Sequence, residues 1–301
     1  MTNSKKTSSA SANSAAYDID KQWIGKSFSS AASTYDEVAV LQREVANRLV
    51  ERLELVQLKP DRILDVGSGT GYCSRLLENR YKKTPVVSLD LSHAMLSHTR
   101  KNEGFIKRLT SKNAYVCGDA ERLPLADESI DMIVSSLALQ WCDLESAFSG
   151  FRRVIKPGGL LMFSTMGPDT LKELRNAWAK ADGHVHVSAF IDMHDVGDAL
   201  MRAGFSDPVM DVETITVTYP TVKKLMADLK AIGSRNALEG RAKGLMGKQR
   251  LKKMIEAYEQ LRKDNVLPAT YEIVYGHAWA PEKGVAPSNI ENAFPIPVRF
   301  K

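Results

Sequence analysis

The sequence predicts an α/β fold in which helices cover both faces of a doubly wound, mostly parallel sheet. A short apolar run, residues 63–66, enters a glycine-rich turn and then a helical stretch. The helical pattern of residues 144–154 stops at Lys156-Pro157-Gly158-Gly159, as Pro and Gly predict. Strand-like runs that alternate with helices indicate a parallel sheet. The four later runs are residues 85–89, 114–117, 129–136 and 160–164.

Size and composition are those of an ordinary globular protein. The 301 residues are 44% apolar and 26% charged, enough for one large domain with insertions. The net charge of +5 is too small to indicate a nucleic-acid partner by itself. No apolar run approaches the length of a membrane span. We therefore expect neither nucleic acid nor membrane as a partner.

The three cysteines, Cys73, Cys117 and Cys142, lie far apart and form no Cys-x-x-Cys pair. This spacing predicts buried free thiols in a reducing compartment, and hence a cytoplasmic protein. A metal site is not expected. His184 and His186 flank one residue without nearby Cys or carboxylate ligands, so we interpret them as structural or substrate-side residues.

The glycine turn, Gly67-x-Gly69-x-Gly71, has the wrong spacing for the common nucleotide motifs. A dinucleotide fingerprint has its third glycine three residues after the second, and a P-loop ends in Lys-Ser/Thr. Asp65, at the end of the strand, would repel a pyrophosphate but suits a cationic ligand. S-adenosylmethionine (SAM), with an ammonium, a sulfonium and no phosphate, fits. For the glycines alone, a turn without any ligand stays an open alternative.

Acidic residues after the next two strands favour SAM. Asp90 follows the glycines by about 20 residues, where a carboxylate accepts both ribose hydroxyls. Leu91 and Met95 are expected beside the nucleoside, and Asp119 and the Ala120 N–H at the adenine. We predict cofactor contacts from Asp65, Gly67, Ser68, Gly69, Gly71, Asp90, Leu91, Met95, Asp119, Ala120 and Leu137.

The flanking segments complete the predicted domain, which spans residues 21–280. Residues 1–20 are expected to be a disordered tail and residues 281–301 a loose one. A helix is expected over 37–55, and Phe28 and Tyr35 before it are candidates to close over the cofactor. A further helix is expected from Ser92 to about Arg108. The second half predicts helices over 169–180, 192–203 and 221–261, and strands over 212–219 and 270–277.

The order Asp-x-Gly-x-Gly-x-Gly (65–71), helix, strand, Asp90 resembles the class I SAM-dependent methyltransferases. The resemblance implies a Rossmann-like, seven-stranded, mostly parallel sheet whose last two strands form an antiparallel hairpin. In this chain helical insertions interrupt that pattern at about 167–190 and 220–266. We expect these insertions to form a lid that determines substrate choice.

Further segments resemble the malonyl-acyl-carrier-protein O-methyltransferases of biotin synthesis. They are residues 28–36 with Leu41-Gln42-Arg43, residues 137–142, residues 228–233 and residues 267–271. The resemblance runs from about Trp23 to Ala280. It implies SAM-dependent methylation of the free carboxyl of a malonyl thioester on acyl carrier protein. The product is the methyl ester that enters pimeloyl and biotin synthesis.

That reaction needs no general base, because a malonyl carboxylate is ionised near neutral pH. A cation must still hold the carboxylate, and Arg175, Lys230 and Arg235 are our candidates. Tyr35, His186 and Tyr271 are candidate hydrogen-bond partners. Because carrier protein is acidic, basic helices are expected to form its docking face. Its residues are Lys223, Lys224, Arg241, Lys243, Lys248, Arg250, Lys252 and Lys253.

Three alternatives remain at this stage. Mitochondrial complex I assembly factors, associated with arginine hydroxylation, resemble the chain at 167–171 and in its Tyr-Pro and Pro-Ala-Thr-Tyr segments. A methyltransferase of another small carboxylate is the second alternative, and a non-catalytic SAM-binding module is the third.

Overall fold

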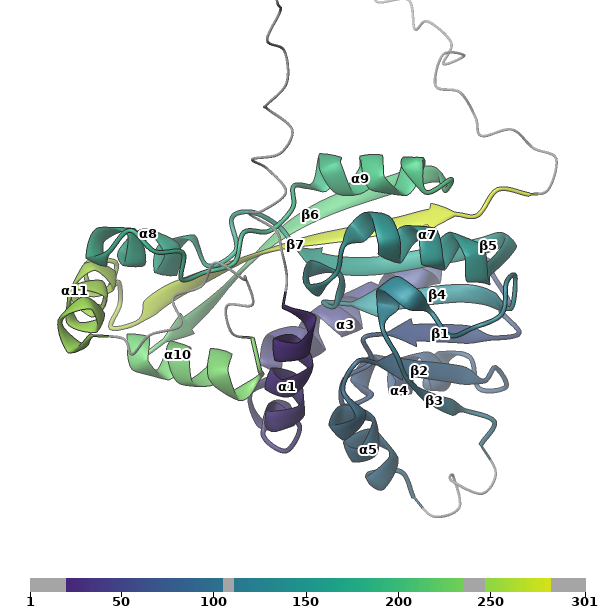
Figure 1. The fold of residues 1–301 in the computed structure, drawn as a ribbon, viewed down its shortest axis with the longest axis horizontal. Helices are drawn as coiled ribbons and strands as arrows, with labels where there is room; N and C mark the ends of the chain where they lie inside the picture. Colours follow the sequence, from purple (N-terminus) through teal and green to yellow (C-terminus); the bar gives the residue numbers. More distant parts are fainter. Residues whose placement is uncertain (1–19, 105–110, 235–246, 283–301) are drawn as a thin grey trace, which may run out of the picture.

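A computed structural model of the chain describes residues 20–104, 111–234 and 247–282. Its centre is a seven-stranded sheet in the order β3-β2-β1-β4-β5-β7-β6, with only β7 antiparallel to its neighbours (Figure 1). The predicted doubly wound, mostly parallel α/β fold is confirmed. The strands are β1 (Ile63–Val66), β2 (Val86–Asp90), β3 (Ala114–Cys117), β4 (Ile130–Ser136), β5 (Ile155–Met166), β6 (Ser206–Tyr219) and β7 (Leu267–Trp279).

Helices pack on both faces of this sheet and around one end of it (Figure 1). The α-helices are α1 (Lys21–Ala31), α2 (Tyr35–Val38), α3 (Val40–Arg52), α4 (Tyr72–Arg80), α5 (His93–Lys101), α7 (Leu144–Val154), α8 (Lys172–Ala181), α9 (Met193–Arg202), α10 (Val222–Ala231) and α11 (Lys248–Glu259). Short 3-10 turns are η2 (Leu53–Leu55), η3 (Ala120–Arg122) and η4 (Leu139–Trp141).

Two hydrophobic cores lie on the two faces of the sheet. Successive strand residues point to opposite faces, so Ile63 belongs to the core under α3 and α4, and Leu64 to the core under α7 and α9. In β4, Met132 and Ile133 divide in the same way. Both neighbours are buried because both faces are covered, which explains why these strands appear as continuous apolar runs.

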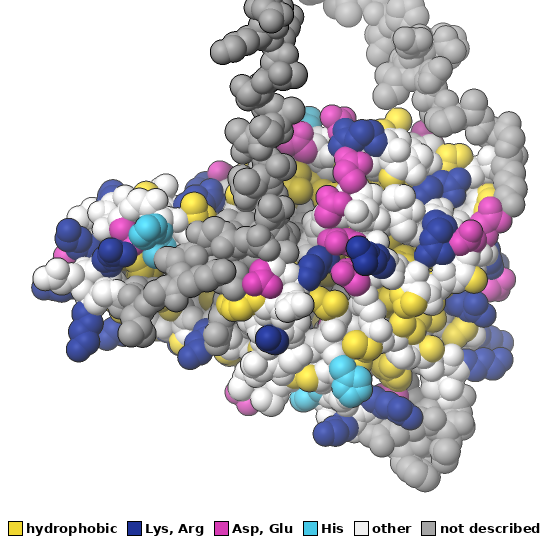
Figure 2. Space-filling model, viewed as in Figure 1, with side chains coloured by type: hydrophobic (Ala, Val, Ile, Leu, Met, Phe, Trp, Pro, Cys, Tyr) yellow, Lys and Arg dark blue, Asp and Glu magenta, His cyan; other side chains and the backbone are white. Residues whose placement is uncertain are grey.

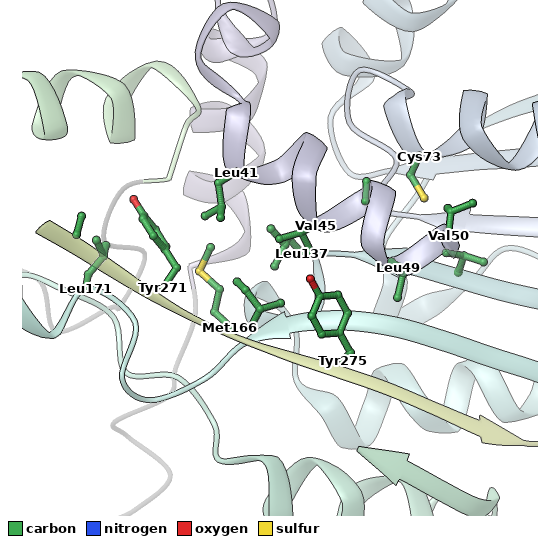
Figure 3. Close-up of a cluster of buried hydrophobic side chains, with 14 of the residues drawn as sticks. Leu41, Val45, Leu49, Val50, Cys73, Leu137, Met166, Leu171, Tyr271 and Tyr275 are labelled. Atoms are coloured by element: carbon green, nitrogen blue, oxygen red, sulfur yellow. The ribbon is translucent and has the colours of Figure 1, made fainter. Parts of the chain in front are cut away.

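The hairpin of β6 and β7 is longer than the rest of the sheet. β5 pairs with β7 only from Ile273 to Trp279, so residues 267–272 of β7 extend past β5 with β6. α8, α10 and α11 gather around this extension, which we call the hairpin arm (Figure 1). Tyr271 lies in its core with Met166 and Leu171 (Figure 3).

Several element boundaries differ from those predicted. The helix expected over 37–55 is interrupted at Ala39, whose ψ of 45° separates α2 from α3. α8 begins at Lys172, later than predicted, because Leu171 has a left-handed φ of 54°. Ser92 caps α5 as predicted, by accepting from the Met95 N–H, but the helix ends at Lys101 rather than near Arg108.

Other segments are longer or divided. β5 begins directly after α7, so Lys156 to Gly159 belong to the strand rather than to a loop before it. β6 begins six residues earlier than residue 212, and β7 extends past 270–277 at both ends. The region 221–261 contains two helices, α10 and α11, and residues 235–246 between them lie outside the described residues.

Cys117 corrects the prediction that all three thiols are buried. Cys73 and Cys142 are buried, but Cys117 is exposed at the end of β3, the edge strand of the sheet. Burial raises the pKa of Cys142 to about 12, and it also raises that of Cys73. Within the described residues, no helix combines the length and apolar character needed to cross a membrane.

The thiols are expected to react unequally with an alkylating reagent. In the native protein at pH 7.5, Cys117 should be alkylated at least tenfold faster than Cys73 and Cys142. Cys117 is exposed to the reagent, whereas burial of the other two thiols raises their pKa and so lowers the fraction of reactive thiolate. Mass spectrometry of peptides after timed alkylation measures the three rates. The denatured chain is the control, in which all three should react alike; equal native rates would contradict the placement of Cys117.

Candidate active site

A cleft of about 680 Å³, counted with its open mouth, lies at the carboxyl ends of β1, β2 and β4. This edge of an open parallel sheet is where ligands usually bind. The glycine turn, the segment after β4 and η3 form its walls, and α1 crosses over it.

The glycines of the turn have distinct steric roles. Gly67, Gly69 and Gly71 all have positive φ, at 71°, 53° and 78°. A Cβ on Gly67 would lie 2.2 Å from the Cβ of Ala138, and one on Gly71 would lie 2.4 Å from Cγ2 of Thr99. Gly69 has no heavy atom within 4 Å of that position and lines the cleft. Close packing against the side chains of Ala138 and Thr99 therefore requires two glycines, and the middle one leaves the turn open to a ligand.

Asp90 links the turn to the end of β2. Its Oδ2 accepts the Gly69 N–H at 2.8 Å, and its Oδ1 accepts the Ser92 N–H at 2.7 Å. Burial raises the pKa of Asp90, and these two hydrogen bonds partly offset the rise. Because a carboxylate has about four acceptor positions, two remain for hydroxyl donors in the cleft. This geometry fits a ribose.

Asp65 is buried behind the turn, where it is 1% exposed, and does not line the cleft. Ser74 Oγ donates to its Oδ2 at 2.5 Å, while Oδ1 accepts no hydrogen bond from any residue the structure describes. Burial raises the pKa of Asp65 to about 7. An unpartnered acidic oxygen in a poorly solvated position favours a nearby positive charge, so the site fits the cationic end of SAM.

The structure brings most of the predicted cofactor residues together. Asp65, Ser68 and Gly71 do not line the cleft and lie in β1 and the turn behind it. Leu137 has a left-handed φ of 51° that is unusual for a branched side chain, and such strain often accompanies a binding site. The predicted residues that line the cleft are Gly67, Gly69, Asp90, Leu91, Met95, Asp119, Ala120 and Leu137. Their contacts with SAM stay predictions.

Helix α1 closes the cleft, and of its residues the sequence predicted only Phe28 in this role. Lys21, Ile24 and Phe28 line the cleft from one side of the helix, at the i, i+3, i+7 spacing of a helical face. The apolar periodicity that would reveal this face in the sequence is weak, because most of the other residues of α1 are polar or small. Lys21 is the sole cation among the described residues that line the cleft.

Lys21 joins α1 to the opposite wall. Its Nζ lies 3.0 Å from Asp119 Oδ1 and 2.7 Å from Glu121 Oε1, and we call this group the Lys21 clasp. Burial lowers the pKa of Lys21, but Cys142 and the two carboxylates outweigh this and raise it. Asp119 Oδ1 also accepts the Glu121 N–H, so only Oδ2 is left to accept from adenine. Asp119 thus holds α1 over the cleft through Oδ1, and its predicted contact with adenine falls to Oδ2.

Phe28 and Tyr35 lie in the cleft wall, as candidates to close over a cofactor should. The Phe28 ring meets Trp141 edge to face, with 5.7 Å between centroids. Tyr35 begins α2, and the next residue, Asp36, accepts from Thr70 Oγ1 at 2.6 Å. Burial, with Asp90 nearby, raises the pKa of Tyr35, so its hydroxyl remains a donor near neutral pH.

Apart from Tyr35, the predicted substrate residues that the structure describes lie outside this cleft. Arg175 and His186 line a separate cavity beside α8, and Lys230 is exposed on α10. Tyr271, 4% exposed in the hairpin arm, is a core residue rather than a wall of the cleft. Arg235 lies outside the described residues. The helical insertions contribute no described residue to the cleft lining, so their role as a lid stays a prediction.

Removing the Lys21 clasp should speed the loss of SAM. We expect Lys21→Ala to raise the SAM dissociation rate about tenfold, because a partly buried ion pair that holds α1 is lost. Stopped-flow fluorescence at two ionic strengths measures this rate. Salt should accelerate dissociation from the wild type more than from the variant. Lys26→Ala, an exposed position of the same helix, is the control, and an equal salt dependence in Lys21→Ala would contradict the clasp.

Comparisons with solved structures agree with this architecture. The YcgJ protein of Bacillus subtilis superposes with a TM-score of 0.55 at 14% identity, covering 78% of this chain and 98% of that one. A SAM-dependent methyltransferase of Thermotoga maritima gives 0.51 at 18% identity, covering 85% and 99%. At these identities the likeness shows the shared fold.

Within the described residues, no group of three or more His, Cys, Asp or Glu has the arrangement of a metal site.

Sequence comparisons are more specific. A family model described as a methyltransferase domain matches residues 64–163. The malonyl-[acyl-carrier protein] O-methyltransferase of Methylovorus sp. is 54% identical over 90% of this chain and 93% of its own length. Its namesake in Laribacter hongkongensis is 55% identical over 88% and 91%. These relatives do not favour the arginine hydroxylase alternative. The chain belongs to the malonyl-[acyl-carrier protein] O-methyltransferase family.

Proposed function

We propose that this protein transfers the methyl group of SAM to the free carboxyl of a malonyl thioester carried on an acyl carrier protein. The methyl ester would enter pimeloyl and biotin synthesis in the cytoplasm. The similarity to enzymes of that name over nine-tenths of the chain carries this proposal. The cleft built around Asp90 supports it independently, since its chemistry suits SAM.

In this proposal, Asp90 accepts the ribose hydroxyls and the open turn at Gly69 lies against the amino-acid end of SAM. Met95, 1% exposed, supplies an apolar wall near the nucleoside together with Leu91. Asp65 supplies the negative charge behind the turn. Asp119 keeps one oxygen for adenine while its other oxygen holds the Lys21 clasp.

Methyl transfer to a carboxylate requires little from acid–base chemistry. When bound, SAM supplies an electrophilic methyl group: the carboxylate oxygen forms the new C–O bond while the C–S bond breaks and sulfur keeps the electron pair. No proton moves, so the residues of the chain position the groups and exclude water. Phe28 and Trp141 enclose the cleft with apolar surface. In this proposal the neutral Tyr35 hydroxyl, also in the cleft wall, donates to the substrate carboxylate.

Carrier protein is proposed to bind at the basic helices of the hairpin arm. Lys223 and Lys224 on α10 are exposed, although Lys224 pairs with Asp228 at 2.6 Å. Figure 2 shows Lys and Arg side chains at this end and elsewhere on the same face, so charge alone does not define the surface. Arg241 and Lys243 lie outside the described residues. The other predicted docking residues, all exposed, are Lys248, Arg250, Lys252 and Lys253 on α11.

The direct test is purified protein with methyl-labelled SAM and malonyl-acyl carrier protein. We expect label to appear on the carrier as a base-labile methyl ester, and none when the carrier bears an acetyl group, which has no free carboxyl. Electrospray mass spectrometry of the carrier should show the added methylene mass. Absence of the ester from the malonyl carrier would overturn the proposed function.

Asp90→Ala should weaken SAM binding by about a hundredfold, because two charge-assisted hydrogen bonds of about 1.5 kcal/mol each are removed. Isothermal calorimetry measures the dissociation constant, and a thermal melt verifies that the variant is folded. Asp127→Ala is the matched control, since Asp127 is exposed and pairs with Arg153 away from the cleft. Unchanged affinity in a folded Asp90→Ala protein would refute the ribose assignment.

A further inference from the structure

A second cavity lies between α8 and the segment that follows it, residues 182–190. It encloses about 1020 Å³, counted with its open mouth. Arg175 and His186, both expected on the substrate side, meet in its wall instead of in the cofactor cleft. Trp178, Pro168 and Phe190 add apolar surface. A polar and aromatic lining of this kind suits an amphipathic guest.

One wall of the cavity is a fixed aromatic pair. The rings of Trp178 and His186 stack with 3.8 Å between centroids and 16° between planes. His186 Nε2 lies 2.8 Å from Asp182 Oδ1, which holds the imidazole in this orientation. Burial would raise the pKa of Asp182, but the His184 N–H and the His186 ring outweigh it, so the pKa is lowered and the carboxylate stays ionised. The wall is therefore preorganised.

Arg175 precedes Trp178 by three residues on α8 and also lines the cavity. Its Nη2 donates to the carbonyl oxygens of Pro168 and Thr170, each at 2.9 Å. These bonds occupy one nitrogen of a fork with five N–H donors, so the guanidinium can still donate to a guest. The backbone segment after β5 thus fixes a cation in the cavity wall without neutralising it.

The distance between the second cavity and the cofactor cleft follows from the sheet register. The Leu137 N–H, at the cleft, donates to Ser164, which pairs with Tyr275 of β7. The Leu171 N–H, beside α8, donates to Thr270 of the same strand. Five residues of strand separate these two levels, or about 17 Å at 3.3 Å per residue. A guest in the second cavity is thus well separated from the reacting methyl group.

The cavity also borders the basic face proposed for carrier protein. Arg250 of α11 lies 3.8 Å from Asp182 Oδ2, and α11 packs along α8. The Arg250 side chain is 54% exposed, so it connects Asp182 of the cavity wall with the surface. The second cavity and the basic helix α11 are therefore neighbours on the hairpin arm.

We propose that the second cavity binds the flexible thioester arm of the substrate, the amide-containing chain that joins the malonyl group to its carrier. This inference rests on the proposed function. The Trp178–His186 wall contacts the methyl and methylene groups of the arm, and Arg175 donates to an amide carbonyl. Arg175 accordingly selects for the carrier-linked arm and does not anchor the malonyl carboxylate.

The test compares two substrates that share the malonyl carboxylate: malonyl-pantetheine, which keeps the arm, and the malonyl thioester of methanethiol, which lacks it. For Arg175→Ala we expect KM for malonyl-pantetheine to rise about tenfold, with kcat and SAM affinity unchanged. KM for the short thioester should stay within twofold of wild type. Ala179→Trp, at an exposed position lining the cavity, should act in the same way by filling it.

Lys172→Ala is the matched control, because Lys172 is an exposed cation of α8 outside the cavity that pairs with Asp169. Wild-type protein that methylates neither malonyl thioester would count against the proposed function itself. If the wild type methylates both, an equal rise in KM for the two thioesters in Arg175→Ala would show that Arg175 acts on the malonyl group, and would overturn the arm site. Unchanged kinetics on malonyl-pantetheine in both folded variants would equally overturn the arm site.

Discussion

The functional end of the molecule depends on the hydrogen bond from the Gly69 N–H to the Asp90 carboxylate. It ties the glycine turn after β1 to the end of β2 and buries a carboxylate at the sheet edge, at the cost of a raised pKa. The turn can make this bond only because Gly67 and Gly71 let the chain pass against Ala138 and Thr99. One hydrogen bond therefore both shapes the glycine turn and positions the carboxylate that is proposed to bind the ribose.

Much of the fold and of the cofactor site was predictable from local pattern. The glycine spacing and the acidic strand ends specified which residues gather at the cleft, because parallel strands bring their carboxyl ends to one edge. The Lys21 clasp was not predictable in this way. It joins residues about a hundred positions apart, and α1 has too few apolar residues to show its inner face. Pairings between charges distant in sequence leave no periodic signal.

The substrate side shows a second limit of sequence reasoning. Arg175, His186 and Tyr271 were chosen for their residue types, but burial and register divide them between a cavity and a core. Tyr271 packs with Met166 because the hairpin extends past β5, and no feature of the local sequence measures how far a hairpin overhangs its sheet. The type of a side chain indicates the chemistry that it can perform, whereas its position in the folded protein depends on the lengths of the strands.

In the proposed function, the hairpin arm separates methyl transfer from carrier recognition. Methyl transfer needs a dry, closed site, whereas a carrier protein is large, acidic and must remain in solvent. Extending β6 and β7 past β5 places α10 and α11, the helices proposed to bind the carrier, away from the cleft but on the same sheet. Contact with the closing helix is retained, since Ser27 of α1 donates to the Gly233 carbonyl beyond α10 at 2.9 Å. The element that covers the cofactor cleft is therefore bonded to the segment that follows α10, one of the helices proposed to meet the carrier.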